Sequence, residues 1–256
     1  MRFVPFTAGV LLVLLQVAVA RSQTFRVETD IYVGSEKAPV LQTLTLFDAD
    51  VVYDLVDGNV DEATVFDLER NRFILLDRKS QRKTELTKDE VLGYVGDVKN
   101  VVTREKPVLF AAANPVFQES YDEATHWLTL SSDHLTYRAL GSVPSEEGIV
   151  ARYQEFANWS ARLNVLIKGS LPPFARLELN RQLAERGFVP SEVERTTVDG
   201  SGFLAKKSLI RAQHHFNWSL SNTDRGRIDK IGEELASFSP VSLVEFRQTP
   251  AVAKAE

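Results

Sequence analysis

Short runs in which apolar and polar residues alternate fill the first part of the chain, between Phe25 and Glu85. A period of two places one set of side chains on a buried face and the other in solvent, as in a half-buried β-strand. The alternation predicts strands over residues 25–33, 40–47, 51–56, 63–68, 73–77 and 81–85. Six strands within about 60 residues leave no room for parallel crossovers, which need a dozen or more residues each, so we expect an antiparallel meander.

Helical spacing replaces this alternation after Glu85. The segment Thr87-Lys88-Asp89-Glu90 fits a capping box, and apolar residues then recur every three or four positions until Pro107, where we expect the helix to end. Three more strands are predicted over 116–121, 126–131 and 134–140. A long helix over about 145–168 follows, with Gly169 as its cap, and a second helix over 174–186 ends at Gly187.

The last part of the chain contains the most regular alternation, over residues 206–220. The same patterns predict a strand over 189–197, a helix over 223–237 and a final strand over 241–247. This order of elements predicts the α+β class, with a strongly curved antiparallel meander sheet and helices covering one face of it. No Pro- or Gly-rich linker divides the chain, so we expect one domain over 21–248 and a flexible tail over 249–256.

The first 20 residues have the three parts of a secretory signal peptide. Arg2 supplies the positive charge, an apolar stretch runs from Phe6 to Val19, and Ala18-Val19-Ala20 supplies small residues at the cleavage site. The stretch is shorter than the roughly 20 residues of a transmembrane helix. We therefore expect cleavage near Ala20, export to the periplasm or the extracellular space, and no integral membrane segment in the mature chain.

Composition narrows the classes of partner and of chemistry. With 30 Lys and Arg against 35 Asp and Glu, the net charge is −5, which argues against a nucleic-acid partner bound by bulk positive charge. The chain has no Cys, which excludes disulfides, thiolate metal sites and a lipid-modified cysteine. Nucleophile elbows, phosphate-binding glycine loops and zinc-protease motifs are also missing from the sequence. We expect no catalytic site, no cofactor and no metal.

Histidine and clustered charges are the remaining candidates for chemistry. His214 and His215 are neighbours on a predicted strand and are expected to face opposite sides of the sheet. His126 and His134 are candidates to meet across a hairpin, as a polar cross-strand pair or, together with Asp133, in a hydrolase site. The acidic residues between positions 48 and 61 lack the spacing of a calcium loop and are interpreted as a solvated sheet edge. The basic residues between positions 78 and 83 either attract an anion or lipid head groups, or keep a hairpin tip soluble.

Two stretches of strand rhythm resemble the lipoprotein-carrier superfamily, the LolA-like fold. They are residues 63–67 followed by 72–77, and residues 127–130 followed by 135–137. Residues 153–156, 171–177 and 244–246 look like an uncharacterised exported bacterial family. The resemblance implies an unclosed β-barrel whose open face is plugged by helices. The two helices around Pro172-Pro173 depart from the simple carrier pattern.

The same resemblance implies an apolar cavity between sheet and helices that holds acyl chains. The candidate lining residues are Tyr53, Trp127, His214, Phe216 and Trp218. The leading hypothesis is an exported, non-enzymatic protein that binds a lipid or a lipidated partner such as a lipoprotein. The alternative is an envelope protein that uses this fold to bind another protein without a lipid.

Overall fold

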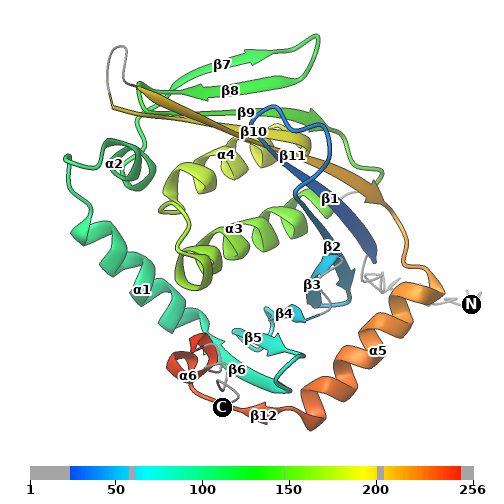
Figure 1. Cartoon of the computed structure of the whole chain (residues 1–256). Helices are drawn as coiled ribbons and strands as arrows, with labels where there is room; N and C mark the ends of the chain where they lie inside the picture. Colours follow the sequence, from blue (N-terminus) through cyan, green and yellow to red (C-terminus); the bar gives the residue numbers. More distant parts are fainter. Residues whose placement is uncertain (1–23, 58–60, 147, 201–204, 249–256) are drawn as a thin grey trace, which may run out of the picture.

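The computed structural model describes residues 24–57, 61–146, 148–200 and 205–248. Within these ranges, twelve strands form a single curved sheet that stays open, as Figure 1 shows. The strands are β1 (Phe25–Val33), β2 (Leu41–Asp48), β3 (Val51–Asp57), β4 (Glu62–Asp67), β5 (Arg72–Asp77), β6 (Arg82–Thr87), β7 (Gln118–Asp122), β8 (Trp127–Ser131), β9 (Leu135–Ser142), β10 (Val189–Asp199), β11 (Lys206–Asn217) and β12 (Ser239–Pro240). The predicted α+β class with a strongly curved, largely antiparallel sheet is confirmed.

Two antiparallel meanders join side by side to make this sheet. One consists of β1 to β6, and the other consists of β7 to β11, interrupted by two helices. They meet where β1 pairs with β11, so that Val27 lies opposite Phe216, and Thr29 opposite His214. The short β12 is the exception to the antiparallel pattern, since it runs parallel to β6 at the sheet edge. A strand near the start of the chain is therefore fixed by one near its end.

The helices are α1 (Lys88–Val101), α2 (Pro107–Ala113), α3 (Ile149–Lys168), α4 (Phe174–Glu185), α5 (Asn222–Ser237) and α6 (Leu243–Arg247). Figure 1 shows α3 and α4 lying inside the curve of the sheet, with α1 and α2 across its open side. In the described part of the chain, none of the helices is long and apolar enough to span a membrane.

Aromatic rings fill the curve of the sheet beneath α3. Phe25 and Phe47 stack with 4.0 Å between ring centroids, and Phe156 of α3 meets Phe47 and Phe66 edge-on at 5.3 Å and 5.1 Å. Such pairs add about 0.5–1.5 kcal/mol each to the free energy gained by burial. A second cluster packs Leu179 and other residues of α4 against β8, β9 and β10. The two clusters fix α3 and α4 over the concave face.

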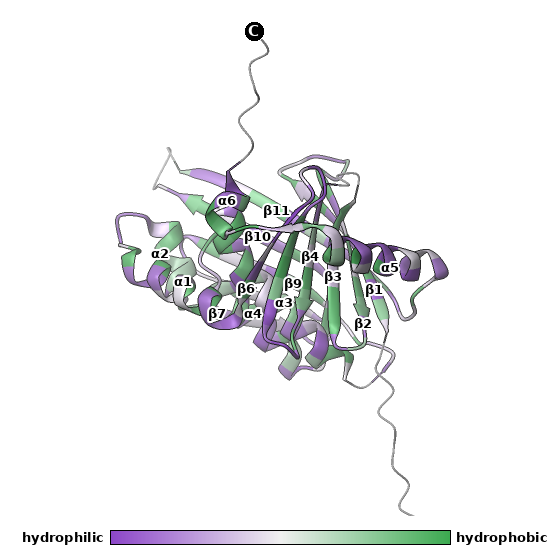
Figure 2. Ribbon diagram, turned by 90° about the horizontal axis from the view of Figure 1, so that it is seen from below, coloured by the Kyte–Doolittle hydropathy of each residue, from purple (hydrophilic) through white to green (hydrophobic). Residues whose placement is uncertain are grey.

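Helix α5 covers the opposite, convex face, which differs from the expectation that helices lie on one face. Its Ile231 is fully buried in a third cluster with residues of β2, β3, β4 and β5. The reason lies in consecutive apolar positions, such as Phe73 to Leu76, all of which are buried. Strands buried on both faces have continuous apolar runs instead of alternation. Figure 2 shows these long apolar stretches in β2, β3 and β4.

Ion pairs anchor both ends of α5 to the sheet. Near its start, the buried Asp224 accepts hydrogen bonds from Arg26 and from the capping Ser221. Near its end, Arg78 donates to Glu234 over 2.8 Å, and the Lys83 ammonium donates to a helix carbonyl. Arg78 and Lys83 thus attach α5 to the hairpin, while Arg82 pairs with Asp77.

Two element predictions are wrong. Pro107 does not end a helix but begins one, since α1 stops at Val101 and Pro107 occupies the first turn of α2, where its missing N–H is not needed. Residues 241–247 were expected as a strand, but most of them form α6. Ser242 accepts a hydrogen bond from the backbone N–H of Glu245, so a local helix cap outweighs the short alternating pattern. The predicted signal peptide, the residues Gly58-Asn59 of the predicted turn that begins at Asp57, and the tail lie outside the described residues.

Candidate functional site

Two adjoining pockets lie between the concave face of the sheet and helices α3 and α4. Their volumes are about 250 Å³ and about 290 Å³. We call the two pockets together the inner cleft. The residues that line both are Ile31, Ala161, Asn164, Arg176 and Ala212. Because they share these walls, the two pockets lie directly next to each other.

Small side chains create the inner cleft. On α3, Ala157, Ser160 and Ala161 face β1 and β11 where larger residues would reach the sheet. On β11, the small side chain of Ala212 lies opposite Ile31 and leaves room on the sheet side of the same pocket. One turn away, Phe156 fills the space against Phe47. The change from large to small residues along α3 thus sets where packing stops and the inner cleft begins.

The floor of the inner cleft is polar as well as apolar. Thr29, Thr43 and Thr45 face it from β1 and β2, and Asp54 and His214 stand at either side of them. Two strands separate Asp54 on β3 from His214 on β11. At about 4.8 Å per strand, their backbones are about 14 Å apart, too far for a shared proton. The resemblance implied an apolar cavity, whereas this one is lined by both kinds of side chain.

His214 has an unusual environment. Its Nδ1 lies 2.9 Å from the hydroxyl of Thr29, while its Nε2 is buried and has no hydrogen-bond partner among the described residues. Burial, with smaller effects from Arg176 and from neighbouring His215, lowers the pKa of His214 to about 3. The imidazole is therefore neutral at any physiological pH and leaves one polar atom unsatisfied.

Asp54 was interpreted with its acidic neighbours as part of a solvated sheet edge, but it is partly buried and lines the inner cleft. The Thr45 hydroxyl donates to its Oδ1 over 2.8 Å. Burial raises the pKa of Asp54 and outweighs the opposing effects of this hydrogen bond and of Lys168. The available signal was its position, since it lies two residues from both Val52 and Val56 and so shares their apolar face of the strand. A carboxylate at such a position indicates either an ion pair or a site.

Two arginines give the other end of the inner cleft a positive charge. Arg176 of α4 lines both pockets, and Arg195 of β10 lines the second. The Arg176 Nε donates to Oδ1 of Asn180 over 2.9 Å, and Nδ2 of Asn180 donates to Oδ1 of Asn158 over 2.9 Å. Neither arginine forms an ion pair with any residue that the structure describes.

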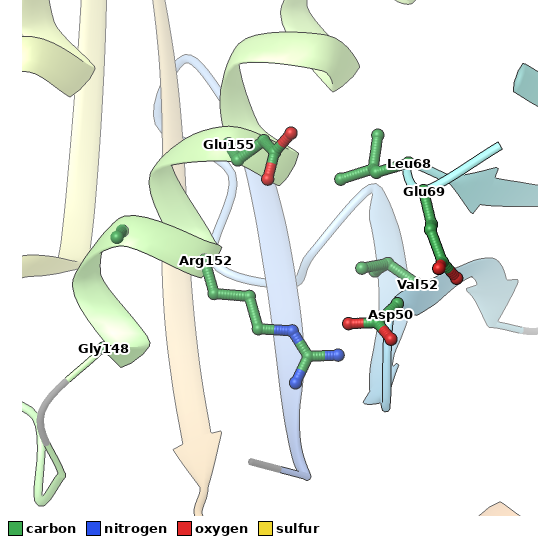
Figure 3. A pocket seen from close by; sticks show the side chains of 8 residues that line it. Asp50, Val52, Leu68, Glu69, Gly148, Arg152 and Glu155 are labelled. Atoms are coloured by element: carbon green, nitrogen blue, oxygen red, sulfur yellow. The ribbon is translucent and has the colours of Figure 1, made fainter. Parts of the chain in front are cut away.

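A second hollow of about 570 Å³ lies at the start of α3. Figure 3 shows the Arg152 side chain extending from α3 toward Asp50, with Glu69 and Glu155 nearby. The guanidinium lies 5.7 Å from the ring centroid of Phe47 and donates to the carbonyl of Ala49. Its charge is thus balanced by local groups, which is the pattern of a structural anchor between α3 and the β2–β3 turn.

Among the five residues expected to line a cavity, His214 lines the inner cleft. Phe216 and Trp218 stack on each other at 5.3 Å and pack against the first core cluster. Tyr53 packs with the α5 cluster on the convex face. Trp127 directly precedes the buried Leu128 in β8 and so points to the other face of the sheet, where the Arg138 guanidinium lies 4.4 Å from its ring centroid. These four aromatic residues therefore belong to the core or to outer surfaces, not to the walls of the inner cleft.

The expected pairing of His126 with His134 is wrong. The two residues lie at opposite ends of the β8–β9 hairpin, because Trp127 pairs with Leu140 and Ser131 with Thr136. His126 stacks on Phe188 at 4.8 Å, and the Nδ1 of His134 lies 3.1 Å from the carbonyl of Val198. In the described ranges, no three potential metal ligands of the His, Asp and Glu types come together. His214 and His215 do face opposite sides, since His215 is exposed and lies 3.5 Å from Asp30.

Comparison with known proteins adds no identity to this geometry: no protein-family model matches the chain, and no curated protein sequence matches it significantly.

Proposed function

We propose that this chain is an exported binding protein that holds an acyl-bearing ligand, a lipid or a lipidated partner, in the inner cleft and catalyses no reaction. The observation that carries the proposal is the inner cleft itself. It lies inside the curve of an open sheet, under α3 and α4, where the LolA-like resemblance implied a cavity. The export part of the proposal is supported by the sequence of residues 1–20.

The size of the inner cleft suits part of a lipid. Ligand pockets in proteins usually measure about 300–1,000 Å³, and the two adjoining pockets measure about 250 Å³ and about 290 Å³. Burial of each methylene group contributes about 0.8 kcal/mol and makes loose demands on shape. Apolar walls from Val27, Ile31, Tyr153 and Phe156 supply such burial.

The acid–base groups of the inner cleft favour binding over catalysis. Asp54 and His214 are too far apart to share a proton, and the neutral His214 is held by Thr29. Polar groups spaced around an apolar space fix the orientation of a ligand. This arrangement supports a binding role for the same residues.

Native mass spectrometry of the mature chain, purified from cells that export it, tests the proposal. We expect a stoichiometric added mass that is lost on denaturation and that lipid analysis identifies as acyl-bearing. A ligand-free mass, together with no uptake of added palmitate, would contradict the proposal and favour the protein-interaction alternative.

Two matched variants place the ligand. Ala212→Phe puts a ring into both pockets and is expected to abolish the added mass. Gln213→Phe adds the same ring one residue later, on the other face of β11, and is expected to retain it. Equal loss or equal retention in the two variants would show that the ligand binds elsewhere.

A further inference from the structure

The arginines of the inner cleft differ from the partly buried arginines that form ion pairs within the sheet and with α5. Arg26 pairs with Asp224, Arg72 with Asp67, and Arg78 with Glu234, at 2.8 to 3.2 Å. Arg176 and Arg195, in contrast, line the same pocket from opposite walls, one from α4 and the other from β10, without a carboxylate partner among the described residues. Two like charges facing the same partly buried pocket repel each other unless an anion joins them.

Arg176 is held in a fixed orientation. Its Nε is bonded to Asn180, which is buried and is itself bonded to Asn158. These bonds leave the two terminal nitrogens of the guanidinium without a hydrogen bond to any described residue. A planar guanidinium that is already oriented loses little entropy when it binds a carboxylate or phosphate with both nitrogens.

The start of α4 adds to this positive end. Its N-cap is Pro173, which makes no side-chain capping bond, and Pro172 and Pro173 line the same pocket as the two arginines. Uncapped N–H groups and the helix dipole favour an anion at this position. Asp54, the carboxylate of the inner cleft, lines the other pocket, on β3, and Lys168 lines the same pocket and balances its charge. The inner cleft therefore has two arginines and a helix start at one end, and a carboxylate with a nearby ammonium at the other.

We infer that the ligand of the inner cleft is an anionic amphiphile, whose carboxylate or phosphate head group is bound by Arg176 and Arg195. Its chain runs past Ile31, Ala161 and Ala212 toward Tyr153 and Phe156. This inference rests on the proposed function, which concerns the chain, and adds the charge and the direction of the head group.

Isothermal titration calorimetry on the delipidated, full-length mature chain tests the head group. Palmitate and the neutral 1-monopalmitoylglycerol carry the same acyl chain, and acetate and inorganic phosphate carry the charge alone. We expect palmitate to bind about tenfold more tightly than the glyceride, since charge-assisted hydrogen bonds are roughly twice as strong as neutral ones. Acetate and phosphate are expected to bind more weakly than either amphiphile.

Variants assign this preference to the two arginines. Arg176→Gln and Arg195→Gln are each expected to weaken palmitate about tenfold and to change glyceride binding less than about twofold. Arg176→Lys keeps the charge but loses the bond to Asn180, and an intermediate affinity is expected. Arg138→Gln, on the neighbouring strand β9 and paired with Glu194 outside the inner cleft, is the matched control and should change neither. Thermal unfolding of each variant checks that it folds, and the two glutamine variants lie on different elements, so one folding failure leaves the other as the test.

The outcomes separate this inference from the proposed function. Equal binding of palmitate and glyceride, or equal weakening of both by the glutamine variants, would overturn the anionic head group while leaving the acyl-binding proposal intact. Binding of neither amphiphile would overturn both. Tight binding of phosphate or acetate alone would show a site for a free anion and would also overturn the amphiphile.

Discussion

The pH dependence of stability should report directly on the environment of His214. Its pKa is lowered from 6.5 to about 3 in the folded chain, chiefly by burial. A base whose pKa is lowered by folding binds protons more readily in the unfolded state. The folded chain is therefore most stable with respect to His214 above pH 6.5, where the ring is neutral in both states. Stability then falls as the pH falls from 6.5 toward 3, because the unfolded chain takes up the proton first.

The magnitude follows from the two values. One pKa unit corresponds to 1.36 kcal/mol, so protonation of the unfolded chain removes about 2 kcal/mol of stability by pH 5 and about 5 kcal/mol in total. His214→Gln removes the titrating group while leaving an amide that can bond to Thr29. At pH 8 we expect the variant to be within about 1 kcal/mol of the wild type, because one neutral hydrogen bond is at stake. At pH 5 it should have gained about 2 kcal/mol relative to the wild type.

Urea unfolding at intervals between pH 8 and pH 5 measures both curves. The difference between the two proteins isolates His214, since acidic groups such as Asp67 and Asp77 contribute equally to both. His215→Gln removes the neighbouring, exposed imidazole, which has only a minor effect on the pKa of His214, and serves as the comparison: its curve should lie closer to the wild type than that of His214→Gln. Parallel curves for the wild type and His214→Gln would refute the reasoning, because they would mean that water or a ligand solvates the protonated ring in the inner cleft.

Three further predictions follow from other groups. Asp54→Asn should raise stability at pH 7 by about 1 kcal/mol, because burial raises the pKa of this carboxyl and makes its charged form unfavourable; urea unfolding should show the gain vanish at acidic pH, where Asp54 is protonated in both states. Asp224→Ala should lower stability by about 3 kcal/mol, since it removes the bonds to Ser221 and Arg26 from a fully buried position, and a smaller loss in thermal or urea unfolding would mean that α5 is held by its apolar face alone. Calorimetry with fatty acids of increasing length should show affinity rising about fourfold per methylene until the inner cleft is full, and an affinity independent of length would contradict acyl burial.

Asp54 shows why a functional site often costs stability. Its carboxylate stays in an environment that raises its pKa, although an asparagine of the same shape would avoid that cost. Destabilising groups of this kind concentrate in binding and catalytic sites, where the ligand supplies the missing interactions. Asp54 and the unsatisfied Nε2 of His214 thus support the proposal that the inner cleft binds a ligand.

Local chemistry determined most of the elements from the sequence. Thr87 and Glu90 form the predicted capping box, with the Glu90 carboxylate accepting from the backbone N–H of Thr87 over 2.7 Å. Gly169 and Gly187 adopt positive φ values of 59° and 76° where the helices were predicted to end. These features involve residues three or four apart and can be read without knowledge of the rest of the chain.

The sequence predicted only in part which face of the sheet each side chain would occupy. The alternation in β11 placed His214 and His215 on opposite sides correctly, because parity is a property of the strand alone. The alternation in β3 did not show which of its two sets of residues faces the concave side, because both faces of β3 meet helices and carry apolar residues. Tyr53 was therefore taken for a lining residue, and Asp54 was assigned to a solvated sheet edge.

The inner cleft itself exists only in the tertiary structure. It needs β1 to pair with β11, almost two hundred residues away, and α3 to present Ala157 and Ala161 at that seam. It also needs Arg176 and Arg195 to face each other from a helix and a strand. The sequence alone determined the α+β class, most of the strands and helix ends, and the parity of side chains, all of which depend on neighbours along the chain. Long-range pairing decided which small residues leave a space and which charges share it, because that depends on contacts with no local periodicity.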